Sequence, residues 1–267
     1  MHRLVETGNN GWGVALARYG FGSLARATHL SGRSTYDSSR PPGLPVTDNR
    51  LTATRAVFFD VGNTIIDEST EYGSWADWIG VPHHTFSAVF GAVIAQGRDY
   101  REVFQYFRPG FDLDAERQRR LDAGLGEYFD ARDLYSDVLP CLRALRESGY
   151  FLGIAGNQTA RAGRLLHELN LPVNFIATSE EWGAAKPSRG FFRKMITSAS
   201  QPPSRILYVG DRLDVDILPA RAAGLMTCLI KRGPWGYILA DSPSAADADL
   251  RIASLTELLG ALQEETV

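Results

Sequence analysis

The chain has 267 residues, of which 44% are hydrophobic and 22% charged, and its formal net charge is -3. This length allows a full hydrophobic core, and the composition is typical of a globular protein. The small net charge gives no sign of nucleic-acid binding, and no apolar run reaches the roughly 20 residues that cross a bilayer. The two cysteines lie within apolar patterns, which favours reduced packing residues and a cytoplasmic location.

Residues 1–54 form an extension rich in glycine, serine, arginine and proline. Proline and glycine oppose regular structure, so we expect this extension to be mostly disordered. Its arginines and scarce acids also fit an organelle-targeting peptide, although arginine exceeds lysine by 25 to 3 across the whole chain. A start codon assigned too far upstream is a third interpretation.

Three apolar runs along the chain each end in polar residues. The run at 56–59 is followed by Asp60, the run at 151–155 by Gly156 and Asn157, and the run at 205–209 by Gly210 and Asp211. Such runs are typical of buried parallel strands, and open α/β sheets bind ligands at the carboxyl ends of their strands. The sequence therefore predicts a polar site at that edge.

After the first strand the pattern becomes helical as far as about residue 132. Proline and glycine separate four predicted helices, at 71–79, 85–96, 99–107 and 114–130. An insertion of this size is typical of a small helical cap. We therefore expect a core made of residues 55–70 and 134–267, interrupted by a cap of residues 71–133.

From residue 137 onward, helices and strands alternate. The predicted helices are at 137–148, 159–170, 188–199 and 216–223, and the predicted strands at 150–155, 174–178, 205–210 and 226–230. This alternation indicates right-handed crossovers between parallel strands. The predicted fold class is α/β, with a Rossmann-like parallel sheet core and an inserted α-helical cap domain.

The predicted edge collects three carboxylates, those of Asp60, Asp211 and Asp216. Each could serve as a local turn or capping residue, but clustered carboxylates repel one another and raise each other's pKa unless a cation neutralises them. Oxygen ligands favour a hard divalent ion, and Mg2+ commonly takes one or two carboxylates together with waters and phosphate oxygens. We therefore expect Mg2+ as the cofactor.

Residues in two further segments could bind phosphate. Lys186 precedes Pro187 and a predicted helix, where an ammonium group can reach a phosphate, although a lone lysine is usually a solvated charge. Asn157, Gln158 and Thr159 lie at the start of another predicted helix and could donate to phosphate or act as ordinary helix caps.

Together these positions resemble the motifs of the haloacid dehalogenase superfamily. Its first motif, Asp-x-Asp-x-Thr, matches Asp60 and Thr64, its third-motif lysine resembles Lys186, and its Gly-Asp-x4-Asp motif matches Asp211 and Asp216. The resemblance runs from about residue 55 to the C-terminus. It implies a capped phosphatase-like fold, with Asp60 as nucleophile and Lys186 as the stabilising cation.

The resemblance also assigns the remaining site residues. Metal ligation falls to Asp60, Asp211 and the backbone carbonyl of Gly62, with Asp216 in support. Phosphate binding falls to four residues: Thr64, Gly156, Asn157 and Lys186.

The chain departs from the family pattern at two glycines. Gly62 replaces the second aspartate of the first motif, the general acid and base, and Gly156 replaces a serine or threonine that holds phosphate. Because the flanking residues follow the motif, we expect the backbone at Gly62 to accept an aspartate. His83 or His84, in a predicted linker, could supply the missing proton.

The leading functional prediction is a Mg2+-dependent hydrolase of a small phosphorylated metabolite, acting through an aspartyl phosphate on Asp60. The alternative is a weak or inactive relative that binds a phosphorylated ligand or a protein partner. Haloacid dehalogenation is a distant third, because dehalogenases of the superfamily lack the aspartate pattern of Asp211 and Asp216. The predicted partner is a small phosphorylated molecule, with neither nucleic acid nor membrane.

Overall fold

The computed structural model describes residues 49–263. Most of the extension predicted to be disordered, residues 1–54, lies outside the described residues. Its last residues form a short helix, α1 (Asn49–Thr52), whose Leu51 packs against the hydrophobic core. Within the described part of the chain, no helix has the length and apolar character needed to span a bilayer.

The core is one parallel sheet with the strand order β3-β2-β1-β4-β5-β6. Its strands are β1 (Ala56–Phe59), β2 (Phe151–Gly156), β3 (Phe175–Thr178), β4 (Ile206–Gly210), β5 (Met226–Ile230) and β6 (Leu250–Ile252). The predicted α/β fold class is confirmed. From β1 the chain adds β2 and β3 on one side of the sheet, and then β4, β5 and β6 on the other side. The strand order therefore reverses between β1 and β4, which is the point where open parallel sheets bind ligands.

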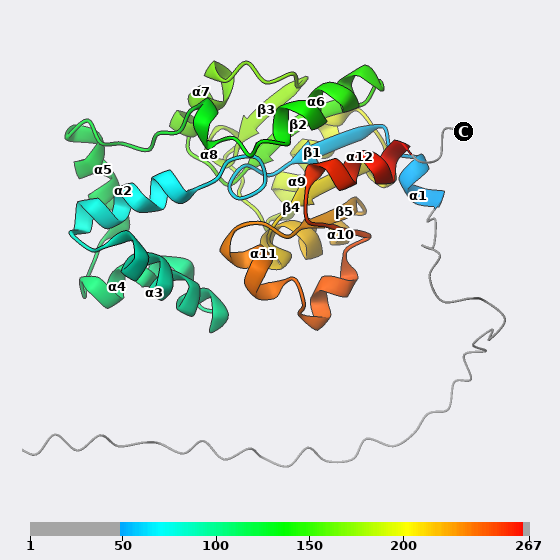
Figure 1. The fold of residues 1–267 in the computed structure, drawn as a ribbon. Helices are drawn as coiled ribbons and strands as arrows, with labels where there is room; N and C mark the ends of the chain where they lie inside the picture. The colour runs from blue at the N-terminus through cyan, green and yellow to red at the C-terminus, as the bar shows by residue number, and fades with distance from the viewer. Residues whose placement is uncertain (1–48, 264–267) are drawn as a thin grey trace, which may run out of the picture. The chain divides into compact units, whose positions relative to one another are not determined.

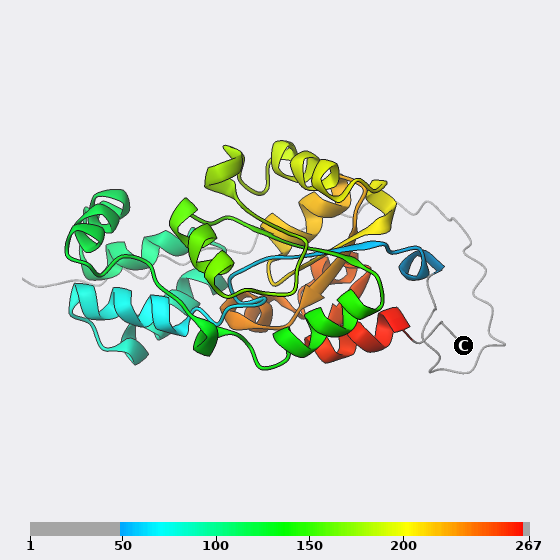
Figure 2. The same ribbon diagram turned by 90° about the horizontal axis from the view of Figure 1, so that it is seen from above.

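Helices cover both faces of this sheet (Figures 1 and 2). On one face, Val57 and Phe59 of β1 pack in a cluster with α6 (Val138–Glu147), α7 (Ala160–Glu168) and α12 (Leu255–Gln263). On the other face, Phe58 of β1 packs with α9 (Arg189–Ala199) and α10 (Leu218–Ala222). Alternate residues of β1 therefore serve opposite faces, as the period of a strand requires.

A helical insertion follows β1. It contains α2 (Ser69–Ile79), α3 (His83–Ala95), the 3-10 turn η1 (Tyr100–Glu102), α4 (Val103–Phe107) and α5 (Leu113–Asp122). The prediction of one helix over 114–130 was wrong beyond Asp122. Gly124 adopts a φ of 73°, and Leu125 N–H donates to the carbonyl of Arg120 at 2.8 Å, which is the bond pattern that ends a helix at glycine.

Several elements were not predicted: α8 (Ser179–Trp182), a 3-10 turn η5 (Pro243–Asp247), strand β6, and helices α11 (Gly233–Leu239) and α12. Residues 233–236 form the first part of α11. Pro234 stands in the first turn, where its fixed φ suits a helix. Trp235 of α11 meets the rings of Phe90 and Tyr100 edge-on, with centroids 5.4 and 5.5 Å away. This helix thus packs against the insertion.

We expect Trp235→Leu to lower the free energy of unfolding by about 1–3 kcal/mol, because two edge-on aromatic contacts contribute about 0.5–1.5 kcal/mol each. Denaturant unfolding measures this. The matched control is Tyr237→Leu in the same helix, because Tyr237 is 70% exposed and its loss should change stability by less than about 0.5 kcal/mol. Equal losses in the two variants would contradict the packing role of Trp235.

Candidate active site

Asp60 stands at the carboxyl end of β1, beside β4. Its backbone N–H donates to the carbonyl of Val209 at 2.9 Å, so the ladder between the two strands continues to this residue. The chain then turns tightly, because the carbonyl of Val61 accepts from the N–H groups of Ile65 and Ile66 at 3.0 Å. The turn holds the carboxyl group of Asp60 at the sheet edge, 7% exposed.

Lys186 lies at the centre of this edge. Its Nζ donates to Asp60 Oδ1 at 2.6 Å, to Asp216 Oδ1 at 2.5 Å and to the hydroxyl of Tyr208 at 3.0 Å. Burial disfavours the ammonium charge, but the carboxylates of Asp216 and Asp60 outweigh burial and raise the pKa of Lys186 well above its usual value. The charged form of Lys186 is therefore favoured by its two carboxylate partners.

The acidic cluster, which we define as Asp60, Asp211 and Asp216, brings one ligand atom of each residue within 4.8 Å of the others. All three residues are buried, and Arg212 N–H donates to Asp216 Oδ2 at 3.0 Å. Burial, with repulsion from its neighbours, raises the pKa of Asp211 well above its usual value, and burial raises that of Asp216 to about 6.

The cluster fits a hard divalent cation. Among the described residues, the buried Oδ2 of Asp211 has no hydrogen-bond partner. A buried carboxylate oxygen left unpaired is costly, and one lysine cannot neutralise three carboxylates. The donor set of clustered carboxylate oxygens is the one that Mg2+ prefers.

The structure also places the expected phosphate-binding residues. Asn157 is fastened to the backbone of Lys186, because its Oδ1 accepts from Lys186 N–H at 2.7 Å and its Nδ2 donates to the Lys186 carbonyl at 2.9 Å. Thr159 caps α7, accepting from Ala162 N–H at 3.0 Å. Thr64 is fully buried, and within the described part of the chain its hydroxyl has no partner.

Neither glycine that departs from the family pattern leaves open space. A Cβ at Gly156 would stand 2.6 Å from Asp60 Oδ1, and a Cβ at Gly62 would stand 2.4 Å from Glu68 Oε1. Contacts this short require the neighbour to move. An aspartate at position 62 would therefore require the carboxyl end of Glu68 to move, because Glu68 already fills that volume. That the backbone at Gly62 accepts an aspartate stays a prediction.

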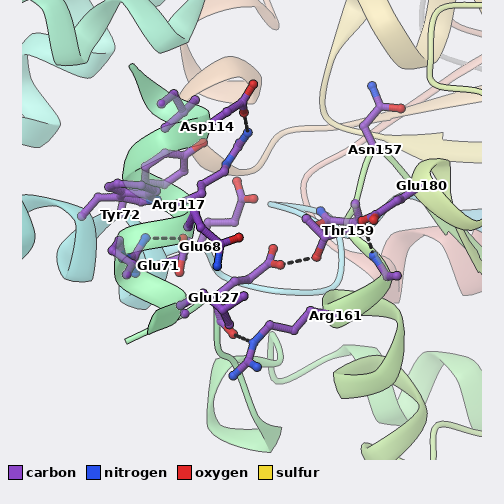
Figure 3. A pocket seen from close by; sticks show the side chains of 18 of the residues that line it. Glu68, Glu71, Tyr72, Asp114, Arg117, Glu127, Asn157, Thr159, Arg161 and Glu180 are labelled. Carbon is purple, nitrogen blue, oxygen red and sulfur yellow. Dashed lines mark hydrogen bonds and ion pairs between the residues drawn. The ribbon is translucent and has the colours of Figure 1, made fainter. Parts of the chain in front are cut away.

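A cavity of about 700 Å3 opens between the insertion and the core (Figure 3). Asp60 is not among its lining residues, but Glu68 and Asn157 are. Burial, reinforced by the carboxylates of Asp60 and Glu71, raises the pKa of Glu68 to about 8. Two lining residues connect the cavity to the surroundings of the cluster: Asn157, which bonds the backbone of Lys186, and Glu68, which bonds Asn63 in the turn after Asp60.

The cavity lining carries both signs of charge. Both arginines and glutamates line it, including Arg117, Glu127 and Arg161. Several are already engaged: Arg117 Nη1 donates to Asp114 at 3.0 Å and Arg161 Nε to the carbonyl of Glu127 at 2.6 Å. The wall is polar enough to hold an ionic ligand.

One sequence interpretation needs correction. His83 and His84 do not lie in a linker at the site but begin α3, and His83 Nε2 stands 2.8 Å from Asp77 Oδ1 on the surface. Asp214, an acid of the same segment as Asp211, pairs with Arg212 at 2.6 Å in the first turn of a π-helical segment, η4 (Leu213–Ile217).

Sequence reasoning missed two residues of the site. Tyr208 lies inside β4 and resembles a core aromatic, yet its hydroxyl contacts Lys186 and donates to the carbonyl of Ala155 at 2.9 Å. Glu68 stands just before α2, in a stretch with several other acids, and no motif distinguishes it. Of the two, only Tyr208 could have been suspected from sequence, because a tyrosine hydroxyl within a buried strand needs a hydrogen-bond partner.

Comparison with known proteins gives matches over most of the chain. The family of haloacid dehalogenase-like hydrolases matches residues 54–224. The glyceraldehyde 3-phosphate phosphatase of Pyrococcus furiosus is 27% identical over 231 residues, which cover 79% of this chain and 94% of that protein. The glyceraldehyde 3-phosphate phosphatase of Methanopyrus kandleri is 36% identical over 104 residues, but this match spans only 38% of this chain and 45% of that protein.

Solved structures are also similar. The HAD-hydrolase YfnB of Bacillus subtilis, solved with bound magnesium, aligns over 79% of this chain and 99% of its own, with a TM-score of 0.59 and 20% identity. At that identity the likeness concerns the fold alone.

Proposed function

Because the chain belongs to the haloacid dehalogenase-like hydrolases, we propose that it is a Mg2+-dependent phosphatase of small phosphorylated metabolites, with Asp60 as nucleophile. One observation carries the proposal: a buried lysine and three carboxylates converge at the switch point of the sheet, and Asn157, which bonds the backbone of that lysine, lines a cavity. A nucleophile, a fixed cation and a ligand-sized space at that position are what phosphoryl transfer to a carboxylate needs.

Asp60 would attack phosphorus and carry the phosphoryl group as an aspartyl phosphate. Lys186 donates to Oδ1 of Asp60 at 2.6 Å, which orients the carboxyl group and would place a positive charge where negative charge gathers on the transferring oxygens. Tyr208 and Asn157 fix the two ends of Lys186, its Nζ and its backbone.

The acidic cluster, with the backbone carbonyl of Gly62, would hold Mg2+. When bound, the ion would neutralise charge on the phosphate and draw it toward the nucleophile. Asp211 offers its unpartnered Oδ2, and Asp216, already bonded to Lys186 and to Arg212 N–H, would support the site.

The substrate we propose is a small sugar-like phosphate. Relatives named glyceraldehyde 3-phosphate phosphatase support this class, as does a cavity of about 700 Å3, within the usual range for small-molecule sites. A panel of three- to six-carbon phosphates, assayed for phosphate release with Mg2+, tests the proposal. Binding without turnover of any compound would favour the alternative, a phosphate-binding relative that lacks catalysis.

We expect Mg2+ to stabilise the protein more at about pH 8 than at about pH 5. In the metal-free protein, burial raises the pKa of Asp216 to about 6, above the unfolded value of about 3.9. The proton thus favours folding at low pH, and this contribution is lost as the pH rises through about 6. Mg2+ competes with that proton, so its effect grows over the same range.

Melting temperatures with and without millimolar Mg2+ at the two pH values measure this linkage. The matched control is Asp214→Asn, which removes an exposed acid of the same segment and should keep the full response. A Mg2+ shift that is equal at both pH values would contradict binding by the acidic cluster.

A further inference from the structure

The carboxyl group of Glu68 occupies the volume that a side chain at position 62 would fill. A Cβ on Gly62 would lie 2.4 Å from Oε1, 2.6 Å from Cδ and 2.9 Å from Oε2 of Glu68. In an aspartate, the carboxyl oxygens stand about 2.4 Å from their own Cβ, by ordinary bond lengths. A carboxyl group is therefore present beside Gly62, although residue 62 has no side chain.

Local contacts hold Glu68 in this position. Glu68 is the residue before α2, where a side chain commonly caps the helix, but it makes no such bond. Instead its Oε2 accepts from Asn63 Nδ2 at 2.6 Å. Asn63 adopts a left-handed φ of 51° and lies against Gly233, where a Cβ would come within 2.3 Å of Asn63 Cγ. Gly233 thus leaves room for the residue that holds Glu68.

Glu68 also faces the cavity. It lines the space beside Asn157, and Figure 3 shows it on the insertion side, near Glu71 and Glu127. On its other side it contacts the turn that carries Asp60. Glu68 therefore contacts both the turn that follows Asp60 and the cavity in which a substrate would lie.

We propose that Glu68 is the proton-transfer residue of this enzyme, supplied from the start of the insertion in place of an aspartate at position 62. This inference rests on the proposed function. Asp60 attacks phosphorus, the bond from phosphorus to the leaving oxygen breaks, and that oxygen takes the proton of Glu68. The Glu68 carboxylate then takes a proton from water, whose oxygen attacks phosphorus and releases inorganic phosphate from Asp60.

The test separates the two steps with the variant Glu68→Gln. An aryl phosphate such as 4-nitrophenyl phosphate needs no proton to leave, so its first turnover should stay near the wild-type rate. Hydrolysis of the phosphoenzyme should then slow, giving a burst of about one nitrophenolate per enzyme molecule. With an alkyl phosphate the first turnover itself should fall by about 10² to 10⁴.

A second experiment moves the carboxyl group from position 68 to position 62. It distinguishes a proton-transfer role of Glu68 from a purely structural one. Glu68→Ala should lose alkyl phosphate turnover, and Gly62→Asp combined with Glu68→Ala should recover part of it, because removal of Glu68 frees the volume for the aspartate. The matched control is Asp77→Asn, an exposed acid of the same helix. It should leave both substrates unaffected.

The outcomes are distinguishable. If the wild type turns over phosphates but Glu68→Gln slows aryl and alkyl substrates equally in the first turnover, with no burst, Glu68 is not the proton-transfer residue. If the wild type releases phosphate from no substrate in the presence of Mg2+, the proposed function fails and this inference fails with it.

Discussion

Asp60→Asn is expected to reduce phosphatase turnover by about 10⁴-fold or more. Losses of this size are typical when the nucleophile is removed from a set of catalytic residues that act together. The amide has nearly the same shape as the carboxylate but cannot attack phosphorus. Steady-state phosphate release with Mg2+ measures the loss. No phosphoenzyme should form on the variant.

Folding is the main confounding factor for this variant. Because the amide removes one negative charge from a crowded site, Asp60→Asn should melt at or above the wild-type temperature without Mg2+. Asp214→Asn, an exposed acid, is the control and should keep full activity. Turnover of Asp60→Asn within tenfold of the wild type would exclude Asp60 as nucleophile.

Lys186→Met is expected to lower the free energy of unfolding by about 3–5 kcal/mol in the absence of Mg2+, and to abolish turnover. The lysine side chain is 1% exposed and bonds two carboxylates. Methionine fills a similar volume but leaves the charges of Asp60 and Asp216 buried and uncompensated. Denaturant unfolding measures the loss of stability.

Mg2+ should restore part of that stability, because the ion supplies the positive charge that the variant lacks. Lys194→Met is the matched control, since Lys194 is an exposed lysine of α9 and its loss should have little effect on either measurement. A Lys186→Met protein as stable as the wild type without Mg2+ would show that the buried lysine does not balance the acidic cluster.

Much of the fold could be predicted from local pattern. The apolar runs before Asp60, Asn157 and Asp211 gave three strands, because a buried parallel strand is apolar on both faces. The spacing of Asp211 and Asp216 and the Lys-Pro pair at Lys186 carried the family resemblance, and the match to haloacid dehalogenase-like hydrolases supports it. A short strand such as β6 and a helix that begins with Gly-Pro, such as α11, carry no comparable periodic signal.

The sequence could not identify the site residues that lie outside the motifs and come to the site only through tertiary packing. At Gly62 and Gly156 the sequence shows only that the family's side chains are absent. It does not show which other side chain occupies the space that they would fill. The folded chain shows that Glu68 lies against Gly62 and Asp60 against Gly156. Long-range packing decides this, since the position of Glu68 depends on Asn63, and that of Asn63 on Gly233, far along the chain.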